Sequence, residues 1–96
     1  MNTNERIKIF KSLMGQAFSK EEVDYFVAIF RRMGYFTAPA STKYHGNYEG
    51  GLFDHSLEVT KSLLHLTKHL KLHWNSKKSP YVVGMFHDLC KCDNYI

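Results

Sequence analysis

Three side chains in this sequence could together hold a divalent cation: His55, His87 and Asp88. Two imidazole nitrogens and a carboxylate oxygen suit divalent transition metals, provided that rigid elements aim all three at one point. Either histidine alone would carry little weight, because a histidine on an apolar helix face is usually a hydrogen-bonded core residue. The argument for a metal site therefore depends on whether the fold makes these side chains converge.

Helices are the elements that the sequence predicts around these residues, in an all-α bundle of about four helices with nothing that reads as a sheet. A helix is predicted from Leu52 to about Trp74, and its apolar stripe predicts that the ring of His55 is buried. That stripe steps by three and four residues through His55, Val59, Leu63, Leu66 and Leu70.

The last predicted helix opens at Ser79, a capping residue followed by Pro80, and carries His87 and Asp88 in its last third. A hairpin over residues 74–79 would pack this helix antiparallel to the preceding one. The end of the last helix would then lie beside the start of the helix that carries His55.

Two further helices are predicted upstream. The first starts near Asn4, a good N-cap residue, and ends at Gly15. The second begins at Ser19, which forms a capping box with Glu22, and stops at Gly34. Their apolar stripes comprise Ile7, Phe10, Leu13, Met14, Val23, Phe26, Val27, Phe30 and Met33. Residues 35–51 break the pattern with Pro and Gly, and a loop this long in a short chain is usually functional.

Two segments stand out by their wording: residues 45–59 read HGNYEGGLFDHSLEV, and after one long helix residues 82–91 read VVGMFHDLCK. Together they closely resemble the HD-domain superfamily of metal-dependent phosphohydrolases. The resemblance covers roughly residues 35–92, and it implies an HD-like helical bundle with phosphohydrolase activity.

The resemblance also implies roles for individual residues. The family's first histidine ligand maps to His55, and its paired His-Asp ligands map to His87 and Asp88. Lys91 matches a position that often meets substrate phosphate, although a solvated lysine at a helix end is an equally good reading. His45 falls where some relatives carry a histidine near the substrate, and the alternative is a water-exposed loop histidine. Manganese, magnesium, iron, nickel or cobalt would suit such a site.

One departure from the family concerns the fourth protein ligand, which is an aspartate on a later helix. The sequence stops at Ile96, eight residues after Asp88, and Asp93 is too close to Asp88 to serve. We therefore expect residues 1–96 to be a single HD-like domain that forms the N-terminal part of a longer one. The alternative is that water or a partner chain completes the coordination of the metal. Three ligands of this type still leave open positions for substrate.

The start of the His55 helix has a backbone explanation as well. Gly50 and Gly51 would let the chain turn sharply and leave room for an anionic ligand at the helix N-terminus. Asp54 could order a neighbouring ring, but an acidic residue in a first helical turn is already favoured by the helix dipole.

Other charged and histidine-rich features have simpler readings. The cluster Lys68, Lys71, Lys77 and Lys78 is interpreted as a solvated helix end, with a role in binding nucleic-acid phosphate as the alternative. The histidines at four-residue spacing could pair on a metal but read as an exposed polar face: His65, His69 and His73.

Composition indicates one folded domain. The 96 residues are 44% hydrophobic with a formal charge of +4, which suits an anionic ligand without requiring one. Cys90 and Cys92 are too close for an ordinary disulfide, so a cytoplasmic, reducing location is expected. No secretory signal or membrane-length apolar run is present in these residues.

Two functions of different class follow from the sequence. The first is a phosphohydrolase or phosphodiesterase acting on a nucleotide or nucleic-acid phosphoester. The second is a catalytically silent HD-fold module that binds a nucleotide or a protein. Nucleic-acid binding through the lysines alone is the weakest hypothesis, and it predicts affinity that falls steeply with salt.

Overall fold

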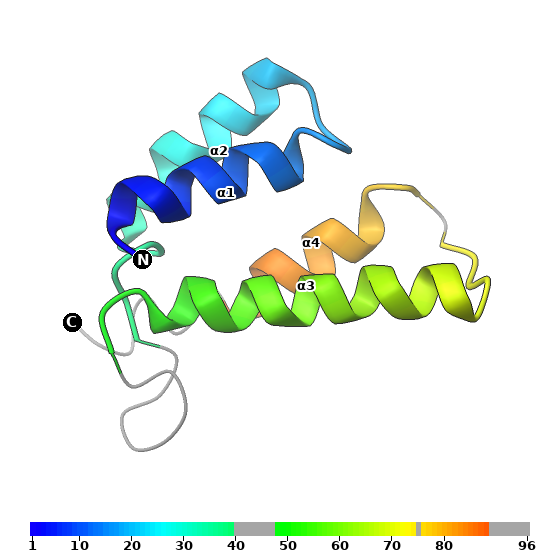
Figure 1. Ribbon diagram of the computed structural model, residues 1–96. Helices are drawn as coiled ribbons and strands as arrows, with labels where there is room; N and C mark the ends of the chain where they lie inside the picture. Colours follow the sequence, from blue (N-terminus) through cyan, green and yellow to red (C-terminus); the bar gives the residue numbers. More distant parts are fainter. Residues whose placement is uncertain (40–47, 75, 89–96) are drawn as a thin grey trace.

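The computed structural model describes residues 1–39, 48–74 and 76–88. Within those residues the chain forms four α-helices and no strand, which confirms the all-α expectation: α1 Thr3–Met14, α2 Lys20–Met33, α3 Gly51–His69 and α4 Ser79–Phe86. The α1–α2 hairpin lies across the α3–α4 hairpin in Figure 1, and α4 runs antiparallel to α3. The predicted antiparallel packing of the last two helices is therefore confirmed.

Capping residues define the first two helices. Ser19 and Glu22 form the predicted capping box at α2, and Gly34 ends that helix in the left-handed conformation, with φ of 79°. For α1 the predicted N-cap was wrong, because Asn2 caps the helix and forms a reciprocal box with Glu5. Asn4 lies inside the first turn, since the box needs its acidic partner three residues after the cap.

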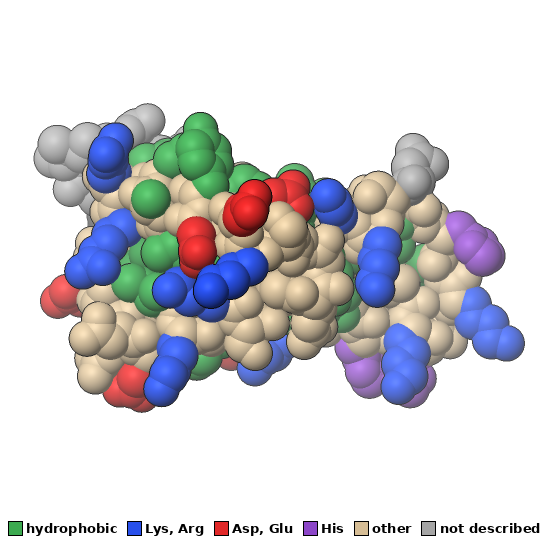
Figure 2. All heavy atoms as spheres, turned by 90° about the horizontal axis from the view of Figure 1, so that it is seen from above, with side chains coloured by type: hydrophobic (Ala, Val, Ile, Leu, Met, Phe, Trp, Pro, Cys, Tyr) green, Lys and Arg blue, Asp and Glu red, His purple; other side chains and the backbone are tan. Residues whose placement is uncertain are grey.

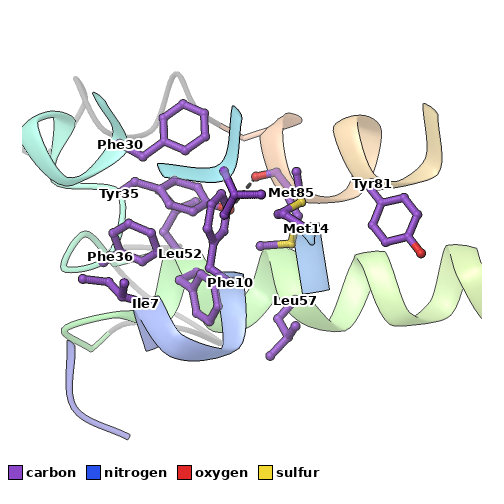
Figure 3. Close-up of a cluster of buried hydrophobic side chains, with 12 residues drawn as sticks. Ile7, Phe10, Met14, Phe30, Tyr35, Phe36, Leu52, Leu57, Tyr81 and Met85 are labelled. Carbon is purple, nitrogen blue, oxygen red and sulfur yellow. Dashed lines mark hydrogen bonds between the residues drawn. The ribbon is translucent and has the colours of Figure 1, made fainter. Parts of the chain in front are cut away.

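The hydrophobic core lies between the two hairpins and is rich in aromatic rings (Figure 3). Phe10 of α1 is fully buried and packs edge-on against Phe30 and Phe36. Tyr35, just after α2, is also fully buried, and its hydroxyl donates a hydrogen bond to the carbonyl of Met85 in α4. This bond ties the segment after α2 to the helix that leads to the candidate site.

The predicted buried face of α3 was wrong. The ring of His55 is exposed, as are Leu66 and Leu70. The buried residues of the helix are instead Gly51, Leu52, Phe53, Ser56, Leu57 and Thr60. Small polar side chains are buried on this face because α4 packs closely against it, a condition that apolar periodicity does not register.

The far end of α3 also differs from the prediction. The helix ends at His69 rather than near residue 74, and Lys71 adopts a left-handed backbone with φ of 51°. The chain then folds back, because the indole of Trp74 donates a 2.8 Å hydrogen bond to Thr67 Oγ1. Among the described residues, no helix is long and apolar enough to cross a membrane.

The last helix is shorter than expected. Pro80 lies in its first turn as predicted, but Ser79 is the first helical residue and no side chain caps this end. The helix stops at Phe86, so His87 occupies the C-cap and Asp88 follows in a turn. These two residues therefore lie just beyond the helix rather than in its last third. Adjacent residues within a helix point about 100° apart, and this constraint is weaker beyond the helix end.

Candidate metal centre

The antiparallel pairing of α3 and α4 brings the three predicted ligands together. His55 Nε2 lies 3.5 Å from Asp88 Oδ2, and His87 Nε2 lies 3.1 Å from the same oxygen. The two imidazole rings are 5.6 Å apart between centroids. Among the described residues, these side chains form the one group of three potential ligands whose donor atoms all lie within 4.8 Å of one another.

The donor atoms remain reachable from solvent. The side chains of His55, His87 and Asp88 are 44%, 31% and 20% exposed. The cluster also lies at the carboxyl end of α4, where the helix dipole favours a positive charge. The position is thus accessible to an ion and to a small substrate.

A hydrogen bond to the backbone fixes which nitrogen of His87 faces the cluster. His87 Nδ1 lies 2.9 Å from the carbonyl oxygen of Gly84. Because a carbonyl oxygen can only accept, this bond requires the proton on Nδ1. Nε2, which faces Asp88, then presents either a lone pair or a second proton. Metal-binding histidines commonly have such an orienting contact on the nitrogen that does not bind the ion.

These donors fit a divalent cation. With metal–ligand bonds of about 2.1 Å, neighbouring ligand atoms lie about 3.0 Å apart in octahedral and about 3.4 Å apart in tetrahedral coordination. Of the two contacts of Asp88 Oδ2, the one at 3.1 Å falls in this range and the one at 3.5 Å lies just above it. A neutral imidazole lone pair and a carboxylate oxygen at such separations repel each other unless a proton or a cation lies between them. The donor set is therefore compatible with a shared ion.

A close contact between helices holds the two halves of the cluster in register. A Cβ atom on Gly84 would lie 2.2 Å from Thr60 Oγ1 and 2.7 Å from Thr60 Cα, so only glycine permits this approach. Thr60 is fully buried and turns its hydroxyl back to the carbonyl of Ser56, 2.8 Å away. This contact joins the middle of α3 to the last turn of α4 and sets the spacing of their backbones.

The start of α3 is anchored to α1 by an ion pair. Arg6 is only 4% exposed, and its Nε and Nη2 donate to the two carboxylate oxygens of Asp54 at 2.9 and 3.1 Å. The hydroxyl of Tyr48 donates to Asp54 Oδ2 at 2.8 Å. Burial would raise the pKa of the Asp54 carboxyl, but the hydrogen bonds from Arg6 and Tyr48 and the Arg6 charge outweigh it and lower that pKa. Asp54 therefore holds the start of α3 against α1, in addition to any interaction with the helix dipole.

The space beside Gly50 is not a pocket for an anionic ligand, contrary to the sequence interpretation. A Cβ atom at this position would lie 2.1 Å from Arg6 Cζ, so the guanidinium fills the space. The amides of Gly51 and Leu52 are also already bonded, to the carbonyls of Tyr48 and Ala38. The first turn of α3 therefore has little capacity left for an external anion.

The remaining predicted site residues are not brought into this cluster. His45, Lys91 and Asp93 lie outside the described residues. His65 and His69 are exposed, with ring centroids 4.1 Å apart, on the second half of α3. His73 follows the end of that helix and does not continue its face.

The basic character of the distal end of α3 is plain at the right of Figure 2, where Lys and His side chains gather without acidic ones. The segment 59–87 contains no Asp or Glu. Lys68, Lys71 and Lys77 are exposed, as the reading of a solvated helix end predicts. Lys78, in contrast, pairs with Glu22 at 3.7 Å and lies over the ring of Phe18.

Sequence reasoning missed two residues that shape the site. Arg6 sits next to Ile7 within the apolar stripe of α1, and nothing in the local pattern marks it as buried or as the partner of a residue 48 positions away. Gly84 left a weak signal, because a glycine inside a helix often marks a close approach of another backbone.

The chain is similar to a curated enzyme, the dihydroneopterin 2',3'-cyclic phosphate phosphodiesterase of Methanocaldococcus jannaschii. The two are 37% identical over 62 residues, a stretch that covers 62% of this chain and 25% of the relative. This chain therefore spans about a quarter of the relative's length. No family model matches the chain, and no solved structure matches it significantly. The likeness supports a phosphodiesterase-like function, and it leaves the substrate open.

Proposed function

We propose that this chain carries the metal-binding part of an HD-type phosphodiesterase, with His55, His87 and Asp88 as ligands of one divalent cation. The convergence of these donor atoms within 4.8 Å is the observation that carries the proposal. The similarity to a protein named as a phosphodiesterase supports the same reaction class. Because the chain spans about a quarter of that relative, the activity of the whole protein is part of the proposal.

Each residue has a definable task in this scheme. When bound, a divalent cation supplies Lewis acidity toward a phosphoryl oxygen and activates water for attack on phosphorus. Asp88 provides the negative charge of the donor set, and the Nε2 atoms of His55 and His87 both face its Oδ2. His87 is held by the carbonyl of Gly84, so Nε2 is the atom it offers. Lys91 and His45 are proposed to neutralise phosphate charge, on the strength of the HD resemblance.

The proposed substrate class is a phosphodiester of a nucleotide or a nucleic acid. The relative's name specifies a cyclic phosphate ester, which is a phosphodiester, and the net charge of +4 suits an anionic substrate. Manganese, magnesium, iron, nickel and cobalt are the proposed candidates for the cation. The alternative is a silent module with the same fold, which would bind the metal or a nucleotide without hydrolysis.

The proposal is tested by metal binding and hydrolysis on the same protein samples. The purified chain is titrated with Mn²⁺, Co²⁺ and Ni²⁺ by calorimetry and assayed with bis(p-nitrophenyl) phosphate. We expect His87→Ala and Asp88→Asn to lose metal affinity and hydrolysis, whereas His65→Ala, an exposed histidine of α3 outside the cluster, should behave like the native chain.

The two functions predict different results in these assays. Metal binding that depends on Asp88 but yields no hydrolysis with any cation would favour the silent module. Hydrolysis that survives both ligand substitutions would refute the enzymatic proposal. If the affinity of the native chain for every tested cation equals that of Asp88→Asn, the metal site itself is refuted.

A further inference from the structure

The buried ion pair between α1 and α3 holds the turn that carries His55. Asp54 uses both carboxylate oxygens, accepting from Arg6 Nε and Nη2 and from the hydroxyl of Tyr48. Two parallel N–H···O bonds fix the direction of the carboxylate as well as its distance. The first turn of α3 is thus restrained in rotation against α1.

The backbone before α3 is shaped around the same guanidinium. Gly50 has φ of 88°, a left-handed conformation, and a side chain there would overlap Arg6. The Gly50 amide donates to the carbonyl of Thr37, and its own carbonyl accepts from the Asp54 amide at 3.1 Å. Removing Arg6 would leave Asp54 with its strongest partner gone and an unfilled space against Gly50.

His55 depends on its helical turn more than His87 does. Its ring is exposed and, among the described residues, its polar contact is to Asp88 at 3.5 Å. His87, in contrast, has the Gly84 carbonyl to orient it. The contacts of the His55 ring among the described residues are with the cluster itself, Asp88 and the ring of His87. Its Cβ position, set by the first turn of α3, therefore determines where Nε2 points.

We propose that Arg6, through the bidentate contact with Asp54, is a positioning residue for His55 in the metal centre. This inference rests on the proposed function, since it concerns the same site. Arg6 itself does not touch the cluster; it fixes the helical turn from which one of the ligands extends. Loss of a partner that hydrogen-bonds a metal ligand directly typically weakens metal binding by about 10- to 100-fold, and for Arg6, which acts through the backbone, we expect the lower end of this range.

The test measures Mn²⁺ affinity of the native chain and of Arg6→Met by electron paramagnetic resonance, together with thermal unfolding of the metal-free forms. Val23→Ala is the matched control, because Val23 is buried in α2 and its truncation lowers stability without touching α3. We expect Arg6→Met to weaken Mn²⁺ binding at least about tenfold and Val23→Ala less than about twofold. Arg6→Lys, which cannot make both hydrogen bonds, should be intermediate.

Tyr48→Phe covers the case in which Arg6→Met fails to fold. Tyr48 is half exposed, so this change preserves the core while it removes one hydrogen bond to Asp54. Because the contact with Arg6 remains, we expect the Mn²⁺ affinity to fall only about threefold. Native-like affinity in folded Arg6→Met, or in Tyr48→Phe where Arg6→Met is unfolded, overturns the positioning role and leaves the metal site intact. If native binding does not depend on Asp88, the proposed function fails first and this inference fails with it.

Discussion

Replacing Gly84 with alanine should separate α3 from α4 and disturb the cluster that joins them. The added Cβ would lie 2.2 Å from Thr60 Oγ1, 2.8 Å from Thr60 Cβ and 2.7 Å from Thr60 Cα. Rotating the threonine hydroxyl relieves the first contact only, since Cα and Cβ are fixed by the helix. The backbones of α3 and α4 must therefore move apart.

The expected loss in the free energy of unfolding of Gly84→Ala is the difference between two opposing effects. Overpacking a close helix contact costs about 3 kcal/mol at the upper end of its usual range, and alanine recovers about 1 kcal/mol of helix propensity relative to glycine. The net loss is about 2 kcal/mol, which for a domain of this size lowers the melting temperature by roughly 8–16 °C. Because the Gly84 carbonyl also orients His87, affinity for a divalent cation should fall about tenfold or more.

Circular dichroism melts and calorimetric metal titrations measure both effects. Val83→Ala is the control, because Val83 occupies the same helix but is 47% exposed, and a change there should stay within about 0.5 kcal/mol. Adding Thr60→Ala to Gly84→Ala should restore only part of the stability, since the contact with Cα remains. A Gly84→Ala chain that melts within about 2 °C of the native chain would refute the backbone-contact argument.

Three other outcomes are expected. Tyr35→Phe removes the hydrogen bond to the buried Met85 carbonyl and should cost about 1–3 kcal/mol in urea unfolding, whereas an unchanged midpoint would mean that water replaces the bond. Hydrogen bonds from the Ser19 amide and hydroxyl hold the pKa of Glu22 below its ordinary value of 4.5. The stability that the ionised carboxylate adds is therefore complete above pH 4.5 and is lost as the pH falls through the lowered pKa. Glu22→Gln should flatten this loss when denaturant midpoints are measured against pH, and parallel curves for the two chains would contradict the assignment. A chelator should lower the melting temperature of metal-loaded native chain, by the equivalent of about 2.7 kcal/mol at a free ion concentration of 100 Kd, and leave Asp88→Asn unaffected.

Local chemistry made parts of the fold predictable. Capping boxes and helix-stopping glycines depend on residues three or four apart, so the bounds of α2 could be predicted from Ser19, Glu22 and Gly34. The prediction of Asn4 as the N-cap of α1 was wrong because Asn2 is also a good capping residue and has its acidic partner, Glu5, three residues later. Such errors shift an element by a turn or less and leave the architecture unchanged.

The buried face of α3 was not predictable from periodicity, because it depends on which helix approaches and how closely. Ser56 and Thr60 are fully buried beneath α4, while Leu66 and Leu70 extend beyond it and remain exposed. The spacing of these leucines places them on the apolar stripe of the sequence, but it does not show whether another helix covers that stripe. The same limit applies to Arg6, whose partner is distant in sequence, so its burial becomes visible only when α1 lies across the start of α3.

Two glycines explain how the exposed side chains of the proposed metal centre can still be held at defined positions. Gly50 lets a buried guanidinium reach the first turn of α3, and Gly84 lets α4 contact the backbone of that helix one turn after Ser56. The first turn of α3 is therefore fixed against α1 at one place and the spacing of α3 and α4 at the other, so the half-exposed rings need little packing of their own. It follows that substitutions at Arg6 and Gly84, which touch none of the donor atoms, should weaken metal binding more than substitutions of exposed neighbours such as Val83.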